Sequence, residues 1–137
     1  MKYLITLIVI ISTFITGCSK QMEIKEQNII VEKLIVKVNH YEDFKVVKNN
    51  EKVKMVREIL SKADWEHAKV DMVRPADYRF IFQFKNPDTQ AKAVLYELWI
   101  SPNKDQVELV IDAESKYVQL DKKSSSEIFK ILTGRKL

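Results

Sequence analysis

Apolar and polar residues alternate along several short stretches of the chain, as they do in half-buried β-strands. Residues 77–84 show this most clearly, because every second side chain there is aromatic. Residues 29–38, which are rich in valine and isoleucine, also predict a strand. Further strands are predicted over residues 44–47, 92–100, 107–112 and 117–120.

Two other stretches repeat apolar residues every three or four positions, which is the spacing of an amphipathic helix. The first covers residues 51–63, with Asn49 or Asn50 as its N-cap, and the second covers residues 122–133. Residues 64–76 between the first helix and the aromatic strand predict a long irregular connection.

The second predicted helix carries signals at both ends. Asp121 is one candidate for its N-cap, and Ser124 with Glu127 has the spacing of a capping box. Gly134 follows the last apolar residue, where a left-handed C-cap is favoured.

These elements predict an α+β fold, an antiparallel sheet of about four to six strands with two helices packed on one face. The strands between residues 77 and 112 are joined by short turns, so we expect them to pair as a meander. The helices are expected to cover the face that carries Tyr78, Phe80, Phe82 and Phe84.

The N-terminus has a different pattern. Lys2 precedes an apolar run over residues 3–15, and residues 15–18 end at Cys18, the only cysteine of the chain. This arrangement looks like a bacterial lipoprotein signal, which is cut before the cysteine so that the thiol can carry a diacylglycerol. Two acyl chains hold a protein stably on a membrane, whereas one does so only marginally.

We therefore expect residues 1–17 to be a signal peptide, residues 18–28 a lipidated cysteine and tether, and residues 29–137 a single domain. The expected location is the extracytoplasmic face of the cell membrane, which the protein contacts through its lipid anchor. The alternatives fit less well, since an uncleaved anchor helix needs about 20 apolar residues. An ordinary secretory signal ends in small residues of the A-x-A kind, which are absent here. A buried free thiol would lie in a core strand, whereas Cys18 directly follows the apolar run.

Charge changes this picture little. The 137 residues include 23 Lys and Arg against 19 Asp and Glu, a net charge of +4. The two signs are interleaved along the chain, which favours a solvated surface over a nucleic-acid-binding face. Because only one cysteine is present, we expect no disulfide within the domain, and its stability must come from a hydrophobic core.

Candidate catalytic groups are few. His67 lies between Asp64 and Asp71 in the sequence, and His40 precedes two acidic residues, but neither set has an established metal-ligand spacing. The serines at positions 124–126 suit a helix N-terminus better than a nucleophile. We expect no enzymatic activity, metal or cofactor, and keep a metal protein built on His67 as an alternative.

Binding candidates lie on the sheet face opposite the helices. Ile81, Leu95 and Trp99 could be neighbours there, with Trp99 as the anchor of an interface. The competing interpretation is that the first strand or the tether folds over them. The residues predicted on this face are Arg79, Ile81, Gln83, Leu95, Glu97, Trp99, Glu108 and Val110.

The segment before the aromatic strand offers a second candidate. Arg74, Asp77 and Arg79 could together bind an anion or a carboxylate. The alternative is that Arg74 and Asp77 pair locally and order the loop. Trp65, just after the first helix, is expected to cover the core.

The signal, the segments WEHAKVDMVRPADYRFIFQF and WISPNKDQVELV, and the closing YVQLDKKSSSEIFKILTG helix resemble small surface lipoproteins of Bacillus-type bacteria, including the YhfM-like group. The resemblance implies a cell-envelope location and no known catalytic activity, and it carries over only Cys18, as the lipidated position. The leading hypothesis is a lipid-anchored module that binds a protein or an envelope ligand. An inhibitor or immunity-type module is the alternative.

Overall fold

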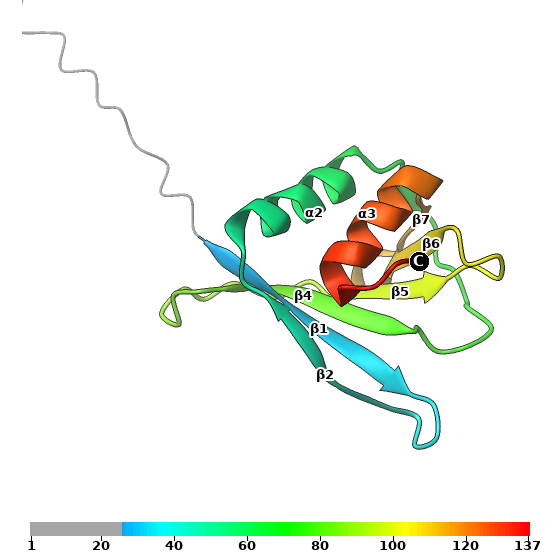
Figure 1. Cartoon of the computed structure of the whole chain (residues 1–137), viewed down its shortest axis with the longest axis horizontal. Helices are drawn as coiled ribbons and strands as arrows, with labels where there is room; N and C mark the ends of the chain where they lie inside the picture. Colours follow the sequence, from blue (N-terminus) through cyan, green and yellow to red (C-terminus); the bar gives the residue numbers. More distant parts are fainter. Residues whose placement is uncertain (1–25) are drawn as a thin grey trace, which may run out of the picture.

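The computed structural model describes residues 26–137, which form one seven-stranded antiparallel sheet and two α-helices (Figure 1). The predicted signal peptide, Cys18 and most of the tether lie outside the described residues. In chain order the elements are β1 (Gln27–Ile35), β2 (His40–Val47), α2 (Asn50–Lys62), β3 (Glu66–His67), β4 (Tyr78–Phe84), β5 (Tyr96–Ile100), β6 (Val107–Ile111), the 3₁₀ turn η1 (Asp112–Glu114), β7 (Lys116–Gln119) and α3 (Lys122–Thr133).

The strands are ordered β2-β1-β4-β5-β6-β7-β3. Strands β4, β5 and β6 form the expected meander, which β7 extends, and β1 pairs with β2 on one side and with β4 on the other. The pairing of β1 with β4 sets Ile29 opposite Phe82 and Ile30 opposite Ile81. The predicted α+β class is confirmed, with a strand count slightly above the expected one.

Four details of the predicted elements were wrong. Strand β1 runs from Gln27 to Ile35, where residues 29–38 were predicted. Residues 64–76 are not wholly irregular, because β3 pairs with β7 at the edge of the sheet. A two-residue strand is too short to show an alternating pattern, so only its tertiary pairing reveals it. Strand β2 begins at His40, before the expected position 44, and β5 begins at Tyr96, because its pairing with β4 extends only to Phe80.

The two helices lie side by side over one face of the sheet (Figure 1). Phe80, Leu98 and Leu109 project from the strands into this layer and are fully buried, as is Ile128 of α3. The aromatic face is the covered one, as predicted. Tyr96 stacks on Phe80 with ring centroids 4.9 Å apart.

The helix ends follow their sequence signals. Asn49 caps α2 by accepting a 3.1 Å hydrogen bond from the Lys52 N–H. Asp121, rather than Ser124, caps α3, because its Oδ1 accepts the Ser124 N–H at 2.7 Å. Gly134 ends α3 with a φ of 73°, a left-handed conformation that glycine adopts without steric cost.

Part of the opposite face of the sheet, at β5 and β6, is covered by an extended segment, residues 68–76, which we call the strap. Ala76 of the strap forms a small buried cluster with Trp99 and Val110 of the sheet, and Met72 of the strap and Tyr41 of β2 pack against this cluster. The Tyr41 hydroxyl donates a 2.7 Å hydrogen bond to the carbonyl oxygen of Ala76, which ties the end of the strap to β2.

Candidate functional site

Trp99, predicted as the anchor of an exposed interface, is buried. Its side chain is 5% exposed and packs with Ala76 and Val110. The indole N–H donates a 2.8 Å hydrogen bond to the carbonyl oxygen of Arg74. The chain therefore covers this residue itself, with the strap rather than with the first strand, and Trp99 holds the strap on the sheet.

Arg74 and Asp77 pair with each other, as the local alternative predicts. The guanidinium meets the carboxylate at two points, with Nη1–Oδ1 at 2.7 Å and Nη2–Oδ2 at 2.9 Å. Asp77 also accepts the backbone N–H of Ile100, and Arg74 donates to the carbonyl of the same residue. The hydrogen bond to Asp77 raises the pKa of Arg74. Together, Arg74 and Asp77 attach the strap to Ile100 at the end of β5.

Arg79 is also engaged within the protein. Its guanidinium carbon lies 3.7 Å from the ring centroid of Tyr41, and its Nη2 lies 3.2 Å from Glu97 Oε1. The residues predicted to bind an anion are thus divided between two internal contacts. Neither Arg74 nor Arg79 is an unpaired cation in this conformation.

Ile81 and Leu95 do not form one exposed patch with Trp99, because the strap covers Trp99. Leu95 immediately precedes β5 and is 42% exposed. Ile81 is half-buried in β4 beside Ile30 of β1. The strap therefore leaves accessible only the part of the predicted binding face near Ile81 and Leu95.

The candidate chemical residues have mostly structural surroundings. Within residues 26–137, no group of three or more His, Cys, Asp or Glu side chains is placed to hold a metal ion, so His67 is not joined to Asp64 and Asp71 in such a set. Ser125 is fully buried, where its Oγ accepts the Val107 N–H at 2.9 Å and donates to the Leu120 carbonyl at 3.2 Å. That serine joins α3 to β6.

The indole of Trp65 packs against the main core, as predicted, and its N–H donates to the carbonyl of Leu60 at 2.8 Å. The hydrogen bond closes the C-terminal end of α2. Trp65 is therefore part of the support for the helix layer.

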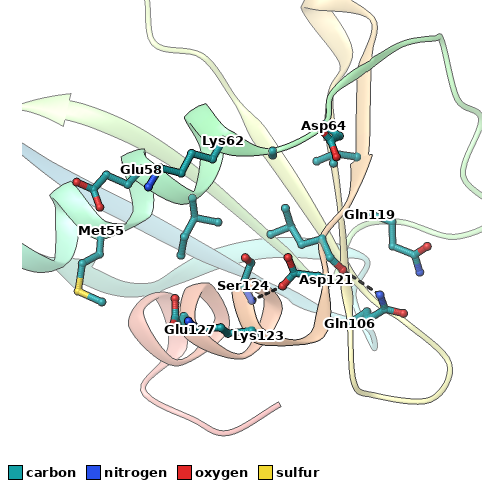
Figure 2. A pocket seen from close by; sticks show the side chains of 14 residues that line it. Met55, Glu58, Lys62, Asp64, Gln106, Gln119, Asp121, Lys123, Ser124 and Glu127 are labelled. Atoms are coloured by element: carbon teal, nitrogen blue, oxygen red, sulfur yellow. Dashed lines mark hydrogen bonds between the residues drawn. The ribbon is translucent and has the colours of Figure 1, made fainter.

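A groove of about 660 Å³ lies between α2 and α3, and we call it the interhelical groove (Figure 2). Its floor is apolar, formed by Ile59, Ala63, Val118 and Leu120. The α2 wall carries Met55, Glu58 and Lys62, and the α3 wall carries Lys123, Ser124 and Glu127. Met55 is 44% exposed at the rim.

Most charges around the interhelical groove have no ion-pair partner. Among the described residues, Glu58, Lys62, Lys123 and Glu127 form no salt bridge. Two lysines stand against four carboxylates, Glu58, Asp64, Asp121 and Glu127, so the lining has a net charge of −2 on a chain of net charge +4. The backbone hydrogen bond from Ser124 lowers the pKa of Asp121 and keeps that carboxylate ionised.

The interhelical groove could not be recognised from the sequence. Its two walls come from helices far apart in the chain, and their adjacency follows only from the tertiary fold. A partial signal was present, since Glu58 with Lys62 and Lys123 with Glu127 place opposite charges four residues apart on each helix. That spacing is ordinary for a solvated helix face, so it does not by itself indicate a site.

No helix in the described part of the chain is long and apolar enough to cross a bilayer.

Among known proteins, the sequence matches one described family. No curated protein and no solved structure matches the sequence at a significant level. Residues 23–137 match the family described as YhfM protein, a span that includes the strap and both walls of the interhelical groove. The resemblance seen in the sequence is confirmed, and the chain belongs to the YhfM family.

Proposed function

We propose that this protein is a lipid-anchored binding module of the extracytoplasmic membrane face, without catalytic activity, and that the interhelical groove receives its ligand. The observation that carries the proposal is the combination of an apolar floor and unpaired charges in one groove of about 660 Å³. Ligand sites typically join a concave apolar surface to a few polar groups that fix orientation.

The charges in the interhelical groove differ from the two arginines that were predicted to bind an anion. Arg74 is bound to Asp77 and Arg79 to Glu97, so those side chains serve the fold. Glu58, Lys62 and Glu127 have no such partner within residues 26–137, and they face a common space. A charged side chain without an internal ion-pair partner is available to an outside group.

The sign of the charge suggests the kind of ligand. Four carboxylates and two lysines favour a molecule whose cationic group meets Glu58, Asp64 or Glu127, and whose apolar part reaches Ile59 and Leu120. A peptide segment with a basic side chain next to an apolar one has this chemistry. The proposed ligand is therefore a cationic, partly apolar segment of a protein or of the envelope.

A photo-crosslinking experiment tests the site. A benzophenone amino acid at Met55, on the groove rim, is expected to give a discrete adduct in intact cells. The same probe at Val73, which is fully exposed on the strap, is the matched control and should give none. Glu58→Lys with Glu127→Lys should abolish the Met55 adduct. Equal labelling from both positions, or an adduct that survives the charge reversal, would contradict the proposed site.

The lipid anchor has its own test. The proposal is supported by the charged start, the apolar run and the position of Cys18 in the sequence. Native protein from membranes should begin at Cys18 with the mass of a diacylglycerol added, and Cys18→Ala should release the domain from the detergent phase. A free thiol, or an intact N-terminal methionine on the native chain, would contradict the anchor without affecting the interhelical groove.

A further inference from the structure

A second hollow lies beside β4, where its pairing with β5 stops. Strand β5 pairs with Tyr78, Arg79 and Phe80 of β4, and its register begins at Tyr96 opposite Phe80. The chain over residues 85–95 leaves the sheet and encloses a hollow of about 440 Å³ against the end of β4. We call this the β4–β5 hollow.

The charge of the β4–β5 hollow is purely positive. Arg57 and Lys92 are the charged residues of its lining, and no aspartate or glutamate contributes to it. Neither cation forms a salt bridge with another described residue. The lining of the interhelical groove has a net charge of −2, from four carboxylates and two lysines, so one small domain carries two hollows of opposite sign.

Arg57 is held in place without being neutralised. Its guanidinium carbon lies 4.2 Å from the ring centroid of Phe82, which orients the group over the aromatic ring. Arg57 also borders two adjoining hollows of about 240 and 430 Å³. It therefore stands where three hollows meet, with its hydrogen-bond donors free for a ligand.

The rest of the lining is apolar or amide-bearing. Tyr96 meets Phe82 edge to face with centroids 5.9 Å apart, and Ala93 and Val94 come from the enclosing chain. Gln27 contributes a side-chain oxygen that is buried and has no hydrogen-bond partner. A buried acceptor without a donor costs free energy, which a ligand donor would recover once the side chain turned toward it.

We propose that the β4–β5 hollow binds a small molecule that carries a phosphate or carboxylate next to a ring or short apolar chain. Arg57 and Lys92 meet the anionic group, and the apolar part packs against Tyr96, Ala93 and Val94. A membrane phospholipid and a soluble organic phosphate both have this chemistry. The inference goes beyond the proposed function and does not depend on the interhelical groove or on lipidation.

Phenyl phosphate is a suitable probe, because it joins an anionic group to a ring. The ¹⁵N-labelled full chain, held in nanodiscs of phosphatidylcholine, is titrated and followed by NMR. We expect saturable shifts of the amides over residues 81–84 and 91–96 and of the Arg57 side chain. Inorganic phosphate and phenol should each bind about tenfold more weakly or worse. Shifts scattered over surface lysines without saturation, or phenol binding as tightly as phenyl phosphate, would overturn the proposal.

Matched variants test the role of Arg57. Arg57→Gln should weaken phenyl phosphate binding about tenfold or more, because charge-assisted hydrogen bonds are lost. Lys52→Gln makes the same change of charge on the same helix but at an exposed position that lines neither hollow, and it should alter the affinity less than about twofold. Both side chains are exposed, and an unchanged amide spectrum elsewhere verifies the fold. Equal effects of the two substitutions would refute a site at Arg57.

The same titration in phosphatidylglycerol nanodiscs identifies the source of the anion. If a lipid headgroup is the ligand, residues 81–84 and 91–96 are already shifted before the probe is added, and Arg57→Gln removes those shifts. If the ligand is soluble, the spectrum and the probe affinity stay as in phosphatidylcholine. Either result supports the site, whereas a lipid-dependent shift that survives Arg57→Gln contradicts it.

Discussion

The two faces of the sheet are covered by different means. On one face α2 and α3 enclose a core in which Phe80, Leu98 and Ile128 have almost no exposed surface. On the other face the strap covers Trp99 and Val110 and adds its own Ala76 to this small buried cluster. The helices satisfy their own backbone hydrogen bonds, whereas the strap, an extended segment, has no such ladder.

The strap is held instead by a few side-chain contacts. Trp99 donates to the carbonyl of Arg74, Tyr41 donates to the carbonyl of Ala76, and Asp77 receives both Arg74 and the Ile100 N–H. Segments with few buried apolar contacts open at a lower free energy than the core. We therefore expect global stability to come from the helix-covered face, and the strap to open without unfolding of the core.

Removing a core aromatic should have the largest effect. Phe80→Ala deletes a ring that is 1% exposed and stacked on Tyr96, and we expect a loss of about 3–5 kcal/mol in the free energy of unfolding. Urea unfolding followed by circular dichroism measures it. Val73→Ala, at a fully exposed position on the strap, is the control and should change stability by less than about 0.5 kcal/mol. A small loss for Phe80→Ala would contradict the central role of the helix-covered face.

The buried hydroxyl of Ser125 gives the next largest effect. Ser125→Ala leaves the Val107 N–H without its acceptor in a dry environment, and the expected loss is about 1–3 kcal/mol. Ser126→Ala, the next residue of α3 but exposed, should cost less than about 0.5 kcal/mol. Thermal unfolding of the two variants distinguishes them, and equal melting temperatures would show that the α3–β6 hydrogen bond contributes little.

The helix-covered face could be predicted from the sequence because its determinants are local. The aromatic alternation from Tyr78 to Phe84, the N-cap signal at Asp121 and the glycine at 134 each act within a few residues. Strand β3 could not be predicted, since two residues carry no pattern and only β7 places them.

For the candidate sites too, contacts between residues close in the sequence could be predicted and contacts between distant residues could not. The Arg74–Asp77 pair joins residues three positions apart, so it could be anticipated, whereas the bond from Trp99 to the strap spans 25 positions. The interhelical groove and the β4–β5 hollow exist only because distant segments meet. Their charged residues look like any solvated helix surface in the sequence alone.

Loosening the strap should have a local rather than a global effect. Trp99→Phe keeps an aromatic ring but removes the indole N–H that bonds the Arg74 carbonyl, at an expected cost of about 1 kcal/mol. Hydrogen exchange should quicken at the Asp77 and Ile100 amides, which are hydrogen-bonded where the strap meets the sheet, and stay unchanged in Leu98 and Leu109. Uniform acceleration across both faces would show that the strap and the core open together.

Alkaline pH should weaken the strap-covered face through Tyr117. Burial and then the 2.6 Å hydrogen bond to Glu108 raise its pKa to about 12. A raised tyrosine pKa means that the folded state holds the proton longer than the unfolded state does. Its stabilisation is complete below about pH 10 and is lost as pH rises toward 12. Allowing for solvent screening, the loss is about 1 kcal/mol or less.

Tyr117→Phe should remove this part of the alkaline loss. Its unfolding free energy, measured at intervals from pH 8 to pH 12, should fall less steeply above pH 10 than that of the unchanged protein. Absorbance at 295 nm follows tyrosinate directly. Tyr41, Tyr78 and Tyr96 also have raised pKa values from burial, so a residual alkaline slope is expected. Identical slopes for the two proteins would contradict the role of Tyr117.

Neutralising charges in the two hollows should affect stability least. Glu58 and Lys62 lie on the interhelical groove and Arg57 on the β4–β5 hollow, and none forms a salt bridge with another described residue. Glu58→Gln and Lys62→Gln should therefore each change the unfolding free energy by less than about 0.5 kcal/mol, and Arg57→Gln by about 1 kcal/mol or less because it also loses the contact with Phe82. Urea midpoints measure this, with Asp77→Asn, at the residue that follows the strap and pairs with Arg74, as the contrasting case. A large loss at Glu58 or Lys62 would mean that the groove charges serve the fold, and would remove the argument that they await a ligand.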